Sequence, residues 1–326
     1  MRTLRYVTVD VFTPVPFSGN QLAVVFDAEG LSTETLQALT REFNYAESSF
    51  VLPPTNETMT RRVRIFTPEM EVPFAGHPTI GTAHVLVATG AVPTSAPARN
   101  AHESPATNVT VVLGENVGNV PVRVELVNGQ PVHAEFTTAQ LPEERGAAAD
   151  REALAAVLGL NKEDLLDSNT HRSAAVSCGL PFHIIPLRSV EAVSRATLNR
   201  QHWERVLAGH WAPWPMVFAM TAGSADNGGL PPHVQGCDIR ARVFVPGSTV
   251  PEDPATGSAN AALAGYLAAR TPRNGALSWR VAQGLELGRP GRLSIAAEKQ
   301  DGNITAVRVG GNSVVICEGT IRLQSA

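Results

Sequence analysis

The sequence predicts an α+β fold made of two similar halves, each a strand-rich layer around one central apolar helix. Three observations lead to this prediction. Short β-branched runs bounded by Gly, Pro or Asn recur along the 326 residues and indicate strands. Two segments, at about 78–88 and 255–269, are apolar on nearly every side, as buried helices are. The same order of strand, proline turn, short loop and small-residue helix surrounds both segments.

The remaining elements follow from local patterns. Residues 31–44 indicate an amphipathic helix, because Leu36 and Leu39 fall on one face. Ser32 is a suitable cap for its start. Residues 150–158 indicate another helix. The strand-like runs cover residues 6–12, 22–26, 49–52, 61–66, 109–113, 120–126, 133–136, 182–186, 216–220, 239–245, 293–297, 306–310 and 313–317.

The repeat consists of two matching stretches of sequence. In the first, residues 64–68 (RIFTP) precede residues 76–84 (GHPTIGTAH). In the second, residues 242–246 (RVFVP) precede residues 252–260 (EDPATGSAN). Two strand-to-helix turns can resemble each other by chance, but agreement in composition and order favours an internal duplication.

The repeat also gives an alignment of the two halves. It places Gly81 opposite Gly257 and His84 opposite Asn260. The expected domains are residues 1–128 and 129–312. The long segments 91–107 and 222–236 are rich in Pro, Gly, Ser, Ala and Asn and are expected to be loops. Whether these loops gate a site stays open at this stage.

Composition excludes several classes of protein. The chain has 26 basic and 30 acidic residues and a net charge of −4, which argues against a nucleic-acid binder. Charged residues make up only 17% of the chain, which argues against disorder. No apolar run is long enough to cross a membrane, so no membrane partner is expected. Residues 2–12 alternate like a strand rather than a signal peptide, so the expected location is cytoplasmic.

The three cysteines, Cys178, Cys237 and Cys317, lie far apart in the sequence. No Cys-x-x-Cys or Cys/His cluster occurs, so neither a disulfide framework nor a zinc site is indicated. Each cysteine is expected to be a small buried hydrophobic residue.

The starts of the two apolar helices are candidate anion sites. A helix start has unpaired backbone N–H groups and partial positive charge, so it suits a carboxylate or phosphate. Gly76 and Gly257 permit close backbone approach, and Pro78 and Pro254 suit a first helical turn. If the halves face each other, a small anion could bind between His77 on one side and Asp253 on the other. Opposed groups of this kind suit a proton-transfer reaction.

Other common catalytic motifs are missing from the sequence. The Gly76–Thr79 segment lacks the lysine of a phosphate-binding loop, and no Gly-x-Gly-x-x-Gly follows a strand. No Gly-x-Ser-x-Gly motif occurs either, which argues against a serine hydrolase.

Five motifs in order resemble the PhzF-like phenazine-biosynthesis isomerases, which share the diaminopimelate epimerase fold. They span roughly residues 6 to 320. The motifs are residues 12–25 (FTPVPFSGNQLAVV), 42–51 (EFNYAESSFV), 66–79 with its Gly-His-Pro-Thr end, 252–259 (EDPATGSA) and 283–290 (QGLELGRP).

The resemblance implies two pseudo-symmetric barrel-like halves, with the last strand, about 313–323, returning to the first half. It also implies that no cofactor and no metal is used. Glu47 maps onto the family's general acid/base, and His77 and Asp253 map onto its other catalytic positions. The residues implied as binding the substrate are Asn20, Gly76, Gly257 and Ser258. The family is commonly dimeric, so a homodimer is expected.

Two departures from the family pattern concern the substrate and the mechanism. The family has Ser before its catalytic Glu, whereas this chain has Ala46, which puts an anthranilate-type substrate in doubt. Epimerase relatives place cysteines at the two helix starts, whereas this chain has Ala75 and Pro254 in those neighbourhoods. The sequence therefore predicts a cofactor-independent isomerase that moves a proton on a small carboxylate-bearing substrate, at the cleft between the halves. An epimerase or racemase of the same fold, or a catalytically silent small-molecule-binding protein, is the alternative.

Overall fold

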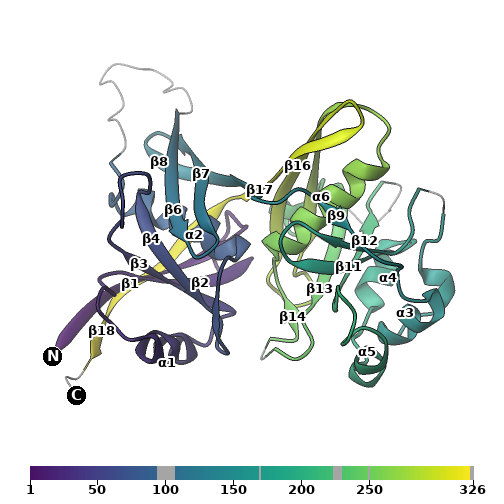
Figure 1. Cartoon of the computed structure of the whole chain (residues 1–326), viewed down its shortest axis with the longest axis horizontal. Coiled ribbons are helices and arrows are strands. Elements are labelled where there is room, and N and C mark those ends of the chain that lie inside the picture. The colour runs from purple at the N-terminus through teal and green to yellow at the C-terminus, as the bar shows by residue number, and fades with distance from the viewer. Residues whose placement is uncertain (94–106, 169, 223–229, 249, 324–326) are drawn as a thin grey trace. The chain divides into compact units, whose positions relative to one another are not determined.

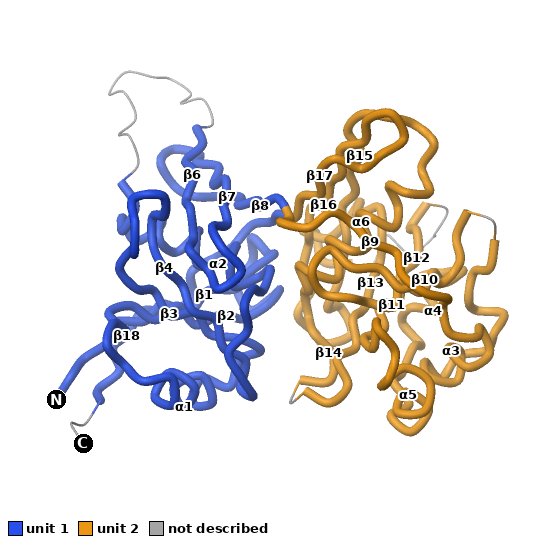
Figure 2. Tube along the Cα trace, viewed as in Figure 1, with its two compact units in different colours: residues 1–137, 310–326 blue, residues 138–309 orange. Residues whose placement is uncertain are grey.

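The computed structural model describes residues 1–93, 107–168, 170–222, 230–248 and 250–323. The chain forms two compact units (Figures 1 and 2): unit 1 contains Met1–Thr137 and Gly310–Ala326, and unit 2 contains Thr138–Val309. The first division therefore falls after residue 137 rather than after residue 128. The reason is that β8 pairs with β7 and completes the sheet of unit 1. Parts of the expected loops 91–107 and 222–236 lie outside the described residues.

Unit 1 is a strand-rich layer around one long helix. Its sheet has the order β18–β1–β2–β3–β4–β6–β7–β8, with β5 added beside β4. The elements of unit 1 are β1 (Arg2–Val11), β2 (Asn20–Val25), α1 (Thr33–Phe43), β3 (Glu47–Leu52), β4 (Arg61–Phe66), β5 (Glu71–Val72), α2 (Gly76–Ala88), β6 (Thr107–Glu115), β7 (Gly118–Val127), β8 (Gln130–Thr137) and β18 (Ser313–Leu323).

Unit 2 has the same kind of sheet, in the order β9–β10–β11–β12–β13–β15–β16, with β14 beside β13. The chain passes from unit 2 back to unit 1 within β17 (Asn303–Gly311). The other elements of unit 2 are β9 (Glu143–Glu144), α3 (Arg151–Val157), β10 (Ala174–Ser177), β11 (Pro181–Pro186), α4 (Val190–Arg195), α5 (Arg200–Val206), β12 (Trp214–Met220), β13 (Ile239–Phe244), β14 (Glu252–Asp253), α6 (Gly257–Arg270), β15 (Gly275–Gln283) and β16 (Gly291–Gln300). Short 3₁₀ helices lie at Lys162–Asp164 and Pro232–Val234.

The two sheets repeat the same directions of strand pairing. In unit 1, β1–β2 and β3–β4 are antiparallel, whereas β2–β3 and β4–β6 are parallel. In unit 2, β10–β11 and β12–β13 are antiparallel, whereas β11–β12 and β13–β15 are parallel. The same alternation of antiparallel and parallel pairs in both units confirms the predicted pseudo-symmetric α+β fold.

Each unit encloses one helix. Every residue of α2 except the last is buried, and α2 contacts β1, β2, β3, β6, β7, β8 and β18. The helix α6 is buried along most of its length and contacts β10, β11, β15 and β16. Close packing of α2 depends on Gly81, because a Cβ there would lie 2.6 Å from Leu22 Cδ2. The small side chains of both helices thus let strands approach them closely.

An ion pair at the same place in each unit fixes the alignment of the repeats. Arg64 donates to both carboxylate oxygens of Glu71 at 2.8 and 2.6 Å. Arg242 donates to both carboxylate oxygens of Glu252 at 2.8 and 2.8 Å. In both units, the arginine lies on the strand before the central helix, and the glutamate lies on the two-residue strand beside it.

The helix starts correct the alignment expected from the sequence. The first residue of α2 is Gly76 and the first residue of α6 is Gly257, so these two glycines are equivalent. Pairing Gly81 with Gly257 is therefore wrong, and so is the equivalence of His84 with Asn260. The sequence misled because the prolines differ in place: α2 includes its proline in the first turn, whereas α6 begins after its proline.

Other sequence expectations also need correction. The short helices α4 and α5 were not expected, because neither has an extended apolar face in the sequence. Cys237 is buried, but Cys178 is half-buried and Cys317 is exposed. The burial expected for Cys317 is wrong because its part of β18 is largely uncovered.

None of the helices in the described part of the chain has the length and hydrophobicity that crossing a bilayer requires.

Candidate active site

Three candidate residues of unit 1 come together from different elements. Asn20 is the first residue of β2, Glu47 is the first residue of β3, and His77 is the second residue of α2. The strands β2 and β3 are parallel, so their first residues lie at the same edge of the sheet. The start of α2 reaches this edge as well, because the buried helix packs against both strands.

The imidazole of His77 lies between the other two side chains. Its Nδ1 atom is 3.2 Å from Nδ2 of Asn20, and its Nε2 atom is 3.5 Å from Oε2 of Glu47. The His77 side chain is only 3% exposed, whereas that of Glu47 is 20% exposed. Glu47 is therefore the member of this cluster that a small molecule can reach.

Burial makes His77 a neutral residue. Desolvation lowers the pKa of His77 to about 3, and a hydrogen bond with the backbone of Gln21 offsets only part of this effect. The contact with Glu47 is thus between a carboxyl group and a neutral ring, not an ion pair at neutral pH. A neutral imidazole that is fixed by Asn20 can orient the Glu47 carboxyl group. It does so without placing a positive charge next to the carboxylate.

The start of α2 lies directly beside this cluster. Its N-cap residue is Ala75, which has no side chain that can cap the helix. Gly76 is buried and has helical backbone dihedrals, so it gives close backbone access rather than an unusual conformation. No side chain caps the start of this 13-residue helix, whose end carries partial positive charge.

The candidate residues of unit 2 gather around the start of α6. The Asp253 carboxylate accepts a hydrogen bond of 2.6 Å from Oγ1 of Thr256, and its backbone carbonyl accepts one of 2.8 Å from Nε2 of Gln283. Thr256 is the N-cap of α6, but its side chain does not cap the helix. Asp253 lies on β14, so it is not the N-cap of α6.

Gly257 and Ser258 are the first two residues of α6, with Gly257 buried and Ser258 half-buried. Their backbone N–H groups belong to the positive end of the helix, as those of Gly76 and His77 do in unit 1. Binding of a small carboxylate at these helix starts stays a prediction.

Gln283 is a site residue to which the sequence analysis gave no role. Its amide group is fully buried and contacts Asp253, Thr256 and Asn260. It lies at the end of β15, about thirty residues after Asp253, so only the folded sheet brings them together. Its place in the Gln-Gly sequence motif was the one available signal.

The candidate catalytic groups do not repeat between the units. Matching the paired strands places Trp214 of unit 2 at the position of Glu47, since Leu22 pairs with Glu47 as Phe182 pairs with Trp214. The same comparison places Val72 of unit 1 at the position of Asp253. Each unit thus carries a carboxyl group where the other has an apolar side chain, which differs from a symmetric two-base arrangement.

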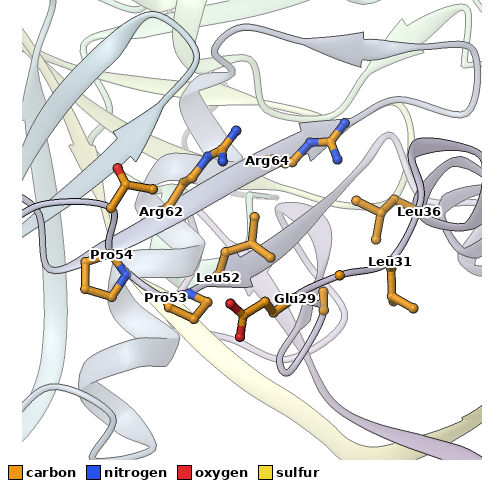
Figure 3. Close-up of a pocket in the computed structure, with 11 residues that line it drawn as sticks. Glu29, Leu31, Leu36, Leu52, Pro53, Pro54, Arg62 and Arg64 are labelled. Carbon is orange, nitrogen blue, oxygen red and sulfur yellow. The ribbon is translucent and has the colours of Figure 1, made fainter.

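A separate pocket of about 320 Å³ lies elsewhere in unit 1. Figure 3 shows it between the proline pair Pro53–Pro54, Glu29, Leu31 and the arginines of β4. None of the candidate site residues lines it. Within the described ranges, no group of three His, Cys, Asp or Glu side chains could hold a metal ion.

Known proteins that are similar to this chain belong to the family that the sequence motifs resemble. A family model described as phenazine biosynthesis-like protein matches residues 9–319. The chain is 39% identical to an uncharacterized isomerase of Mesorhizobium japonicum, covering 98% of this chain and 99% of that protein. It is 33% identical to the trans-2,3-dihydro-3-hydroxyanthranilate isomerase of Pseudomonas fluorescens, covering 98% and 99%. A PhzF family protein of Bacillus anthracis has the same fold, with a TM-score of 0.81 and 24% identity over 99% of this chain and 100% of that one.

Proposed function

Because this chain belongs to the phenazine biosynthesis-like (PhzC/PhzF) family, in which its relatives are isomerases, we propose that it is a cofactor-independent isomerase that moves a proton on a small carboxylate-bearing substrate. The observation that supports this most directly is the cluster of Glu47, neutral His77 and Asn20 at one edge of unit 1. It combines a reachable carboxyl group with a buried neutral ring that orients it.

In this mechanism, Glu47 is the general acid and base. Its carboxylate removes a proton from a substrate carbon, and the electron pair of the broken C–H bond moves into an adjacent double bond. The protonated Glu47 exchanges its proton with solvent and then donates a proton to a different carbon, so the double bond shifts and no group is gained or lost. A positioned acid/base of this kind contributes about 10²–10⁴-fold to the rate.

The helix starts bind the substrate carboxylate in this proposal. The candidate donors of hydrogen bonds to its oxygens are the backbone groups around Gly76 at the start of α2 in unit 1 and those of Gly257 and Ser258 at the start of α6 in unit 2. Asn20 contributes through its contact with His77. In unit 2, Asp253, which accepts a hydrogen bond from Thr256, is the candidate for a second catalytic carboxylate.

In this proposal, the substrate is not the anthranilate-type compound that the name of the Pseudomonas fluorescens relative gives. Ala46, directly before Glu47, provides no hydroxyl group where the family has serine. A substrate hydrogen bond made to that hydroxyl would be lost, which costs about 0.5–1.5 kcal/mol. A substrate with an apolar group beside the reacting carbon fits Ala46 better.

The alternative function is an epimerase or racemase of the same fold. A two-base epimerase needs a proton donor and an acceptor on opposite faces of one carbon. The positions equivalent to Glu47 and Asp253 hold Trp214 and Val72, so the acid/base groups lack the symmetry of such an enzyme. This favours the isomerase.

Solvent exchange tests the proposed function. The protein is incubated in deuterated water with a panel of unsaturated and hydroxylated carboxylic acids. We expect one carbon-bound deuterium in the product of its substrate, at the carbon to which Glu47 delivers the proton when the double bond shifts. Nuclear magnetic resonance of the product gives the position. Deuterium at the original carbon with inverted configuration would identify an epimerase. Binding with neither deuterium incorporation nor conversion to a product would identify a catalytically silent binding protein.

We also propose a cytoplasmic homodimer. Strand-rich units with open sheet edges can pair them with a second copy. Light scattering is expected to give about twice the chain mass of 34.6 kDa. A mass that stays at that of one chain at high concentration would contradict the dimer.

A further inference from the structure

A buried carboxyl group that the proposed mechanism does not use lies beneath the start of α2. Glu115, the last residue of β6, is only 7% exposed. Its Oε1 atom lies 2.7 Å from Oγ1 of Thr79, which is in the first turn of α2. The same Oγ1 atom lies 2.8 Å from the backbone carbonyl oxygen of Ala75, the N-cap residue. Glu115 thus connects through one hydroxyl group to the turn that carries Gly76 and His77.

The hydroxyl of Thr79 has two short contacts but only one proton. The carbonyl oxygen of Ala75 can only accept a hydrogen bond, and an ionised Glu115 could also only accept. One of the two short contacts would then have no hydrogen. Both are satisfied if Glu115 is protonated, because its O–H donates to Thr79 and the Thr79 hydroxyl donates to Ala75.

Unit 2 has a permanently neutral group at the equivalent position. The parallel pairs Arg62–Gly114 and Arg240–Ala282 correspond, so the next residues, Glu115 and Gln283, are equivalent. Gln283 differs from protonated glutamic acid only by an NH₂ group in place of OH.

The residue that bridges to the helix start also has an equivalent. Asn260 occupies the place of Thr79, and its Nδ2 atom donates to the carbonyl of Thr256 at 2.9 Å and to Oε1 of Gln283 at 2.8 Å. An amide group has two hydrogens, so Asn260 supplies both bonds itself. Thr79 has only one, so in unit 1 the missing hydrogen must come from Glu115.

The surroundings of Glu115 favour the neutral acid as well. Burial raises the pKa of Glu115 to about 8, and the contact with the Thr79 side chain, which favours the carboxylate form, offsets this only in part. Among the described residues, no charged group on α2, β4 or β7 shifts this pKa. Its second oxygen, Oε2, has no hydrogen-bond partner among them, which is tolerable for a neutral acid and costly for a carboxylate.

We propose that Glu115 is a positioning residue that works as a neutral carboxylic acid: through Thr79 it holds the first turn of α2, and with it Gly76 and His77, in the geometry needed for catalysis. Its effect on turnover rests on the proposed function. Its protonation state does not, and can be tested without a substrate.

The sign of the pH effect follows from the raised pKa. Between the ordinary pKa of 4.5 and about 8, the folded protein holds a proton on Glu115 that the unfolded chain releases. The free energy of unfolding therefore falls as pH rises through this window and levels off above it. Glu115→Gln keeps the neutral donor and lacks this slope.

The experiment compares the melting temperature of the wild-type chain and of Glu115→Gln from about pH 5 to about pH 9.5. The wild type is expected to lose at least about 5 °C relative to the variant across the window. Gln283→Glu is the matched reciprocal variant, because it places a carboxyl group at the equivalent position of unit 2. Its melting temperature is expected to fall by a similar additional amount as pH rises. A difference between wild type and Glu115→Gln that does not change with pH would overturn the proposal.

Two further measurements separate the possible outcomes. In protein with ¹³C-labelled glutamate, the carboxyl resonance of Glu115 is expected to be that of a protonated acid at neutral pH. The resonance is assigned by its absence from the spectrum of Glu115→Gln, or from that of Glu115→Asp if the Gln variant does not fold. An ionised resonance there would overturn the proposal. With a substrate in hand, the turnover rate of the wild type is expected to fall above about pH 8, and Glu115→Gln to rescue this loss. If the turnover rates of the wild type and of Glu115→Gln fell in the same way above about pH 8, the positioning role would be rejected, even if Glu115 were found to be protonated.

Discussion

Replacing Glu47 by Gln is expected to lower the turnover rate by about 10²–10⁴-fold, whereas substrate affinity stays within about tenfold. Glutamine preserves the shape of the side chain and its contact with His77, but it cannot take a proton from carbon and return it. Steady-state kinetics on the substrate found by solvent exchange, together with calorimetric binding to the variant, measure the two effects separately. The Gln variant should also fail to introduce deuterium.

Variants of the neighbouring residues provide the comparison. His77→Ala and Asp253→Ala are expected to weaken both binding and turnover, because these residues position groups as well as contribute to the reaction. The outcome that contradicts the mechanism is full activity in Glu47→Gln. Loss of binding as large as the loss of turnover would instead make Glu47 a binding residue.

Replacing Arg242 by Ala is expected to lower the free energy of unfolding by about 3–5 kcal/mol. The Arg242 side chain is only 8% exposed and forms the two-bond ion pair with Glu252. Its other nitrogen donates to the carbonyl oxygens of Val193 and Ala196 at 3.1 and 2.6 Å, at the end of α4. Removing it leaves the largely covered carboxylate of Glu252, 12% exposed, and the helix carbonyls without their donor. Denaturant unfolding monitored by circular dichroism measures the loss.

The repeat supplies a matched control for this variant. Arg64 forms the equivalent ion pair with Glu71 in unit 1, but its side chain is 16% exposed and that of Glu71 is 23% exposed. Its remaining hydrogen bond is to the Thr33 side chain, not to helix carbonyls. Arg64→Ala is therefore expected to cost only about 1 kcal/mol. Equal losses in the two variants would show that burial and the α4 carbonyls add nothing to the ion pair.

Several features of the fold can be predicted from the sequence alone because they depend on local patterns. The two central helices are apolar on all sides, and a helix of that composition must be enclosed whatever surrounds it. The matching strand-turn-helix stretches indicated the duplication, since each half repeats the same local order of residues. Glu47, His77 and Asp253 were identified as candidates from short motifs, although their roles remain predictions.

Other features depend on which distant residues the sheet brings together. The correct pairing of Gly76 with Gly257 became visible only when the helix starts and strand registers were known. Gln283 and Glu115 were missed because each reaches its helix start from a strand far along the chain. No local pattern encodes such a contact.

Local sequence patterns are enough to predict the enclosed helices, the duplication and the candidate residues Glu47, His77 and Asp253. The chemical environment of the buried groups depends on the folded structure. Enclosure of α2 by strands lowers the pKa of His77, and desolvation of the strand end beneath that same helix raises the pKa of Glu115. Desolvation is the sum of many long-range contacts, so it is decided by the packed structure and not by neighbouring residues in the chain.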